Sequence, residues 1–407
     1  AIVLWCSLIL AAMPAFMLIE GQPVLVAFFE AASAAVTLGT SLIPAEQMSA
    51  AMIAYRSVTA WLGGLLTIML AIYVLGRYTV GGTPNRDLRF VLHGFSRGDP
   101  RLSQTFFEVF VPYLALTLMC AAALALARVE PEKALMVALN VVATSGLPAQ
   151  PTGGSVLNNQ LAEAIMLVFM IAGATSIILM RAVIGRRWRQ MQDAGEAGGF
   201  VIAVGLIGAL AFVAPLFVEG GDRVLWSGMF NRVFDAISTM TTTGIVHNQN
   251  SGLGLPVELL VGLALIGGGA YSTAGGIKMF RLQAMVRHSL NEVKRLVFPD
   301  QLLPNSVDTD DGQFATAKAI WSAFFAGLLM VVILMVLFSI SGHAFIDSMA
   351  LAVGGFANAG NLVAAHLVVD EIGGIPGSTL VLISLAGIAG RVEVLVILAA
   401  FGRSRWA

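Results

Sequence analysis

Apolar residues occur along the chain in long runs separated by short polar stretches. A helix needs about 20 mostly apolar residues to span the hydrocarbon core of a bilayer. Eight runs are long enough, at residues 1–19, 57–76, 106–127, 161–184, 199–218, 255–285, 315–340 and 377–401. This pattern predicts an all-α membrane protein.

A shorter apolar run lies between the two members of each successive pair of long runs. The short runs cover residues 24–36, 132–143, 225–240 and 344–357. They are too short to span a bilayer, so we expect re-entrant half-helices that enter and leave on one side.

A turn rich in small and hydroxyl residues follows each half-helix. The four turns read VTLGTS at 36–41, ATSGLP at 143–148, TTTGIV at 241–246 and FANAGNLV at 356–363. Each contains one glycine in a matching position: Gly39, Gly146, Gly244 and Gly360. The chain therefore reads as four copies of one unit, a type of internal repeat that is typical of transport folds.

These units predict four pseudo-repeats of helix, half-helix, glycine turn and helix around one central pore. We assign repeat one to residues 1–76, repeat two to 104–185, repeat three to 199–290 with an interrupted second helix, and repeat four to 315–402. The linkers are then 77–103, 186–198 and 291–314.

Composition and charge agree with a membrane protein and orient it. The chain is 57% hydrophobic and 12% charged, against about 25% charged in an average soluble domain. A net charge of -1 gives no basic excess for nucleic-acid binding. Seventeen of the 23 Lys and Arg residues lie in or beside the linkers or in the C-terminal tail. Basic residues accumulate in short cytoplasmic loops, so we expect cytoplasmic linkers and glycine turns that face outside.

The glycine turns have the composition of an ion filter. Half-helices entering from outside direct the partial negative charge of their C-terminal ends into the membrane, where it stabilises a cation. A ring of backbone carbonyls in the turns can replace the water shell of a monovalent cation. The expected filter residues are Thr37, Leu38, Gly39, Thr144, Ser145, Gly146, Thr242, Thr243, Gly244, Asn358, Ala359 and Gly360. Any single glycine is equally well explained by a tight turn, whereas four matching turns favour the filter.

Residues 255–285 are too rich in glycine for one regular helix. The residues expected to break it and to form a gate beneath the filter are Gly267, Gly268, Gly269, Ser272, Thr273, Gly275 and Gly276. Unwound backbone at membrane depth must be buried in protein or line a cavity. The alternative is close packing of small residues against a neighbouring helix. Lys278 either holds this loop or marks its cytoplasmic end.

Arg391 lies midway along the last apolar run. A charge there is costly unless it faces a cavity or a partner. Below the filter it would oppose cations electrostatically and could contact carbonyls of the broken segment. A pair with Glu393 is less favoured, because residues two apart on a helix point in different directions. Asp235 and Asp347 either draw cations to the mouth or act as solvated or capping carboxylates.

Three motifs resemble one family of transporters. They are GGGAYSTAGGIKMFR at 267–281 followed by HSLNEVKRLVFP, RSVTAWLGG at 56–64, and GRVE at 390–393. Together with the four-fold plan, they resemble the Trk/Ktr/HKT superfamily of potassium transporters, and in particular its TrkH-type pore subunits.

The resemblance implies potassium uptake across the bacterial inner membrane, with potassium bound at the filter residues. Glycine at all four filter positions goes with preference for potassium, and serine in the first repeat with sodium transport in some plant relatives. It also implies a homodimer and a cytoplasmic regulatory ring of the TrkA or KtrA kind. NAD or ATP and ADP would bind that partner, and we expect no organic cofactor in this chain. TrkH-type members usually have two further helices before repeat one.

Other functions stay open. Sodium or ammonium could permeate the same scaffold, and a non-conducting scaffold or receptor is a further possibility. The latter leaves Arg391 and the four turns unexplained. An intramembrane hydrolase would also leave the turns without a role, so we do not expect an enzyme.

Overall fold

The computed structural model describes residues 2–76, 80–82, 102–148, 157, 159–184, 195–213, 226–247, 254–297, 310–367 and 375–394. The predicted linkers 77–103 and 186–198 lie largely outside these residues, and the C-terminal tail lies wholly outside them.

The described residues form helices and contain no β-strand. Repeat one contains α1 (Ile2–Leu18), α2 (Val24–Ala35), η1 (Ala45–Gln47), α3 (Ala50–Leu70) and η2 (Ala71–Gly76), followed by η3 (Val80–Gly82). Repeat two contains α5 (Leu102–Leu126), α6 (Pro131–Val142), α7 (Gln160–Ala174) and α8 (Ile177–Ile184). Repeat three contains α10 (Gly195–Val213), α11 (Trp226–Met240), α12 (Val257–Ile266) and α13 (Met279–Val297). Repeat four contains α14 (Asp310–Ile340), α15 (Phe345–Ala357), α16 (Gly360–His366) and α17 (Gly377–Val392).

The four half-helices expected from the short apolar runs are α2, α6, α11 and α15. Their bounds agree with the predicted ranges to within one residue. In each repeat the half-helix packs between the first helix and the second helix. The predicted all-α architecture of repeated units is therefore confirmed.

The units close into a ring. The second helix of each repeat packs on the half-helix of the next: α3 on α6, α7 on α11, α12 on α15, and α17 back on α2. Because the last contact joins repeat four to repeat one, the four half-helices surround one common axis.

Glycines allow second helices to approach the half-helices closely. A Cβ on Gly63 would run into the carbonyl of Ala35, and one on Gly390 into the carbonyl of Phe356. Each carbonyl belongs to the residue four positions before the turn glycine of its repeat. A side chain at either glycine would displace the end of a half-helix.

The second helix of repeat two is broken, although residues 161–184 read as one continuous run. Helix α7 ends before Thr175, whose backbone is extended with ψ 161°. The freed backbone groups bond to a neighbouring segment: Gly269 N donates to Ala174 O at 2.9 Å and Ile177 N to Tyr271 O at 3.1 Å. Hydropathy cannot show a break whose cause is a segment nearly 100 residues away in the chain.

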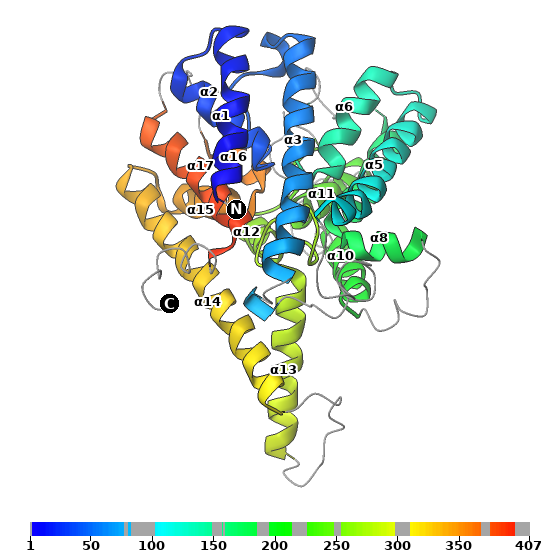
Figure 1. Cartoon of the computed structure of the whole chain (residues 1–407), viewed down its shortest axis with the longest axis vertical. Helices are drawn as coiled ribbons and strands as arrows, with labels where there is room; N and C mark the ends of the chain where they lie inside the picture. Colours follow the sequence, from blue (N-terminus) through cyan, green and yellow to red (C-terminus); the bar gives the residue numbers. More distant parts are fainter. Residues whose placement is uncertain are drawn as a thin grey trace.

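Three other boundaries differ from the expected ones. Helix α3 begins at Ala50, where the hydroxyl of Ser49 caps it by accepting from Met52 N. The short helix α16 follows the fourth turn directly. Helices α13 and α14 extend into the range expected as a linker, and Figure 1 shows them projecting together from the rest of the molecule.

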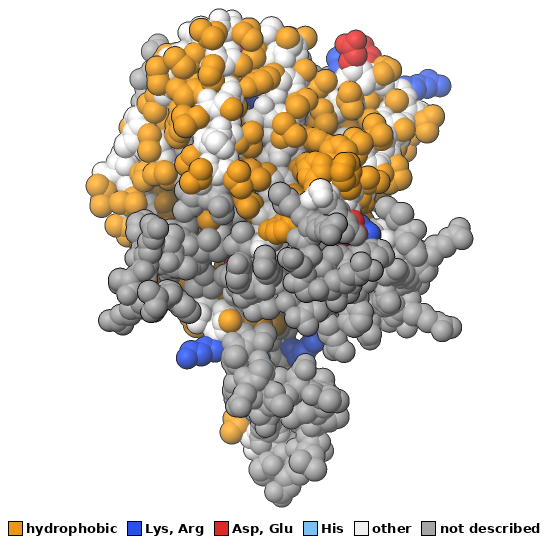
Figure 2. Space-filling view, viewed as in Figure 1, with side chains coloured by type: hydrophobic (Ala, Val, Ile, Leu, Met, Phe, Trp, Pro, Cys, Tyr) orange, Lys and Arg blue, Asp and Glu red, His pale blue; other side chains and the backbone are white. Residues whose placement is uncertain are grey.

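The outer surface is suited to lipid. Three described helices are long and apolar enough to cross a membrane: Ala50–Tyr73, Thr105–Leu126 and Ala317–Ile340. Large apolar side chains such as Leu118, Val168 and Leu329 are more than half exposed. In Figure 2 hydrophobic side chains cover most of the upper part of the visible face. These features support the expected multi-pass membrane location.

Candidate ion filter and gate

All four half-helices end in the same way. A left-handed residue lies one or two positions beyond the last residue of each half-helix: Thr37 (φ 54°), Thr144 (φ 50°), Thr242 (φ 52°) and Asn358 (φ 57°). The next amide then donates to a carbonyl five residues back, as Leu38 N does to Ser33 O at 2.8 Å. This is the Schellman arrangement, which normally places glycine at the left-handed position.

Threonine at a left-handed position is uncommon. For a β-branched residue a positive φ is a conformational outlier that costs on the order of 1–3 kcal/mol. Three of the four turns have this outlier, at Thr37, Thr144 and Thr242. Such strain persists only where the surrounding structure imposes it, and it concentrates at functional sites.

The four turn glycines pack against one another in a closed ring. A Cβ on each glycine would collide with the backbone of the next turn: from Gly39 to Gly146 N at 2.5 Å, from Gly146 to Thr243 O at 2.5 Å, from Gly244 to Gly360 N at 2.6 Å, and from Gly360 to Leu38 O. Gly39 and Gly244 also have positive φ values of 86° and 76°. The structure thus brings the predicted filter turns together, at distances that only glycine permits.

The interrupted segment between α12 and α13 lies under this ring. Residues 267–275 are all buried. Thr273 Oγ1 donates to Val142 O at 3.2 Å, at the end of half-helix α6. Gly275 N donates to the hydroxyl of Thr242 at 2.7 Å, at the end of α11. The unwound backbone is therefore bonded to the half-helix ends of two repeats, as non-helical backbone in a membrane requires.

Arg391 joins this segment to the first half-helix. Its Nε donates to Val36 O at 2.8 Å, and its two terminal nitrogens donate to Thr273 O and to the hydroxyl of Thr37. The side chain is buried, and the ion pairs between described residues do not include it. Its positive charge is therefore held at the end of the first half-helix by neutral acceptors.

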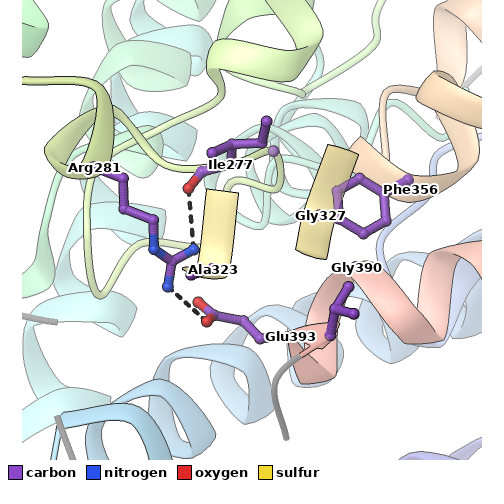
Figure 3. A pocket seen from close by; sticks show the side chains of 9 residues that line it. Ile277, Arg281, Ala323, Gly327, Phe356, Gly390 and Glu393 are labelled. Atoms are coloured by element: carbon purple, nitrogen blue, oxygen red, sulfur yellow. Dashed lines mark hydrogen bonds and ion pairs between the residues drawn. The ribbon is translucent and has the colours of Figure 1, made fainter. Parts of the chain in front are cut away.

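Glu393 has a different partner from the one considered in the sequence. Its carboxylate accepts from Arg281 Nη2 at 2.6 Å, and Arg281 Nη1 donates to Ile277 O at 3.1 Å (Figure 3). Both charged residues line a pocket between the ends of α13 and α17. Lys278, at the end of the interrupted segment, donates to Ala274 O and so holds the loop.

Buried carboxylates bond to the chain that follows the glycine turn in repeats one and three. Glu30 and Asp235 each lie nine residues before the turn glycine of their repeat. Glu30 accepts from Leu42 N at 2.6 Å, and Asp235 accepts from His247 N at 3.0 Å. Asp235 is buried, and it also accepts from Gly254 N at 3.0 Å, so it bonds to loop backbone rather than to solvent.

The chain is similar to known potassium uptake proteins and to a cation transporter. No protein-family model matches the chain. It is 26% identical over 324 residues to the Trk system potassium uptake protein TrkH of Vibrio parahaemolyticus, covering 76% of this chain and 65% of that protein. TrkH of Escherichia coli K12 is also 26% identical, over 323 residues with the same shares. An uncharacterised cation transporter of Methanocaldococcus jannaschii is 25% identical over 378 residues, covering 90% of this chain and 75% of that protein.

The fold agrees with the same group. The crystal structure of the potassium transporter TrkH from Vibrio parahaemolyticus matches with a TM-score of 0.84 at 23% identity, covering 100% of this chain and 84% of that one. The resemblance to TrkH is confirmed. The chain spans 65% of the length of the curated TrkH proteins that it matches.

The TrkH-like motif at residues 56–64 has a structural basis that its sequence did not reveal. Arg56 is fully buried and donates to Pro148 O at 2.6 Å and to Ser41 Oγ at 2.8 Å. Its Nη1 lies 3.9 Å from Glu30 Oε2. Arg56 and Glu30 were absent from the expected site, since their partners come from other parts of the chain.

We predict that Arg56→Met destabilises the folded protein by about 3–5 kcal/mol, because it leaves the buried Glu30 carboxylate without its cationic partner. Thermal unfolding of the purified protein in detergent measures the change. Lys133→Met is the matched control: Lys133 contacts Glu130 at 2.8 Å, but the two side chains are 45% and 71% exposed. An exposed pair contributes about 0–1 kcal/mol. If Arg56→Met and Lys133→Met lowered the stability equally, Arg56 would not be the cationic partner on which the buried Glu30 depends.

Proposed function

We propose that this chain is a pore-forming subunit for potassium uptake, with the four glycine turns as its selectivity filter. The observation that carries the proposal is the closed ring of Gly39, Gly146, Gly244 and Gly360 at the ends of four half-helices. The names of the TrkH relatives and the fold match support the same function.

Selectivity in this account comes from backbone atoms. The four half-helix ends carry partial negative charge toward the axis, which stabilises a cation that has left water. Carbonyls of the turn residues replace its hydration shell. Because the turns touch, one added side chain in the ring would alter the coordination of all four.

The interrupted segment and Arg391 form the gate below the filter. The segment blocks the axis, and the guanidinium at Thr37 and Val36 opposes a cation that leaves the filter inward. Opening requires the contacts of Arg391 with Thr273 and of Gly275 with Thr242 to break. Flux is passive once the segment has moved.

Orientation and partners complete the proposal. The filter faces outside in the plasma membrane, the inner membrane of a bacterium, and the basic linkers face the cytoplasm. The pore subunit forms a homodimer over a cytoplasmic ring of the TrkA or KtrA kind. The sequence has no nucleotide-binding fingerprint in a strand-to-helix setting, so NAD or ATP and ADP act on that ring.

We predict that Gly39→Ser weakens the preference for potassium over sodium by at least about tenfold, equivalent to about 1.4 kcal/mol. The new Cβ would lie 2.5 Å from Gly146 N, so the ring must deform. Rubidium uptake into liposomes, with potassium, sodium and ammonium as competitors, measures the preference.

Gly21→Ser is the control for backbone strain. Gly21 also has a positive φ of 63°, but a Cβ there meets nothing within 4 Å. The preference of Gly21→Ser for potassium over sodium should match that of the wild type. If sodium or ammonium inhibits rubidium uptake by the wild type as strongly as potassium does, that ion and not potassium alone is the substrate. If Gly39→Ser has the same ion preference as the wild type, the proposed filter is rejected.

We predict that Arg391→Gln raises the rate of rubidium uptake several-fold, since it removes the buried charge and weakens the contact with Thr273. A tenfold rise in the uptake rate would correspond to a transport barrier lower by about 1.4 kcal/mol. Arg181→Gln is the control, because Arg181 pairs with Glu108 instead of with a glycine turn. The distance between Arg181 Nη2 and Glu108 Oε1 is 3.2 Å. A rate for Arg391→Gln equal to that of the control would refute the gating role.

A further inference from the structure

Polar side chains bridge all four seams between neighbouring repeats around the filter. The bridges are Arg56 to Pro148 O at 2.6 Å, Glu163 to His247 Nε2 at 2.9 Å, Asn361 to Thr239 Oγ1 at 2.5 Å, and Thr40 to Gly360 O at 3.0 Å. We name this set the girdle. It links repeat one to two, two to three, three to four, and four to one.

Two members of the girdle occupy equivalent positions. Arg56 and Glu163 each lie 17 residues after the turn glycine of their own repeat, in α3 and α7. Arg56 reaches forward to the turn of the next repeat, and Glu163 to the residue that directly follows the next turn. Arg56 contacts the carbonyl two residues after Gly146, and Glu163 contacts the side chain three residues after Gly244.

Further contacts hold the residues at both ends of these two bridges. Arg56 also donates to Ser41, the last residue of the first turn, and Glu163 is 1% exposed. On the far side, His247 is held by Asp235 through its backbone N–H, and its ring lies edge-on to Phe230 and Phe234 at 5.5 Å and 5.4 Å. Both contacts therefore join the glycine-turn region of one repeat to that of the next.

We propose that Arg56 and Glu163 are positioning residues that set the width of the filter by holding the turns of repeats two and three outward. A filter that can contract coordinates a smaller cation, so the width decides how well sodium is rejected. The inference rests on the proposed function, and it assigns to these two side chains a part in selectivity without contact with the ion.

The test is rubidium uptake into liposomes with sodium and potassium as competitors. We expect Glu163→Ala to take up rubidium, but its preference for potassium over sodium should be at least threefold lower than that of the wild type. Glu163→Gln should restore most of that preference, because its amide can still hydrogen-bond His247 Nε2. If Glu163 had a purely structural role, Glu163→Ala would lower the amount of folded protein without changing the preference for potassium over sodium.

Asp347→Asn is the matched control. Asp347 contacts His366 at 2.8 Å, a similar carboxylate–imidazole contact, but both residues lie in repeat four and Asp347 is 38% exposed. Its selectivity should equal that of the wild type.

Arg56→Lys is a second, independent variant. Lysine keeps a positive charge near Glu30 but lacks the planar fork that reaches Ser41 and Pro148 together. We expect the same loss of preference as in Glu163→Ala.

The outcomes separate the two proposals. No uptake by the wild type would reject the proposed function itself. A selective wild type with equally selective Glu163→Ala and Arg56→Lys would overturn the positioning role and leave the filter intact. Loss of preference in Asp347→Asn as well would also overturn it, since any polar change near the mouth would then suffice.

Discussion

The closed contact between four glycine turns is the constraint on which the rest of the structure depends. Each turn glycine lies so close to the next turn that a Cβ would enter its backbone. The half-helices must therefore end at the axis, and their last turns must reverse within two residues. The left-handed threonines accomplish this reversal at a conformational cost that the surrounding packing sustains.

Most of the buried charged side chains among the described residues lie around that ring. Only 12% of the residues are charged, yet Glu30, Arg56, Glu163 and Asp235 are buried beside the turns and Arg391 is buried below them. Buried charges are costly in a bilayer protein unless they are bonded. Arg56, Glu30 and Arg391 bond to a glycine turn or to the end of a half-helix, and Glu163 and Asp235 bond to His247, just beyond the third turn. The cost is therefore incurred beside the turns.

Much of the architecture could be predicted from periodicity alone. The half-helices, the four turns and the break near Gly267 follow from run lengths and glycine content, which are local properties. The break at Thr175 and the contacts of Arg56, Glu163 and Glu30 could not be predicted, because their partners lie many residues away and depend on how the repeats close. The burial of Asp235 and its contacts with His247 N and Gly254 N could not be predicted either, because they depend on how the chain folds back after the third turn.

The central claim is that one cation site lies on the axis of the glycine ring. Anomalous scattering from rubidium in a crystal of the purified protein tests it most directly. We expect rubidium on the axis, level with Gly39, Gly146, Gly244 and Gly360. Rubidium bound elsewhere in the folded protein, with none at the ring, would contradict it.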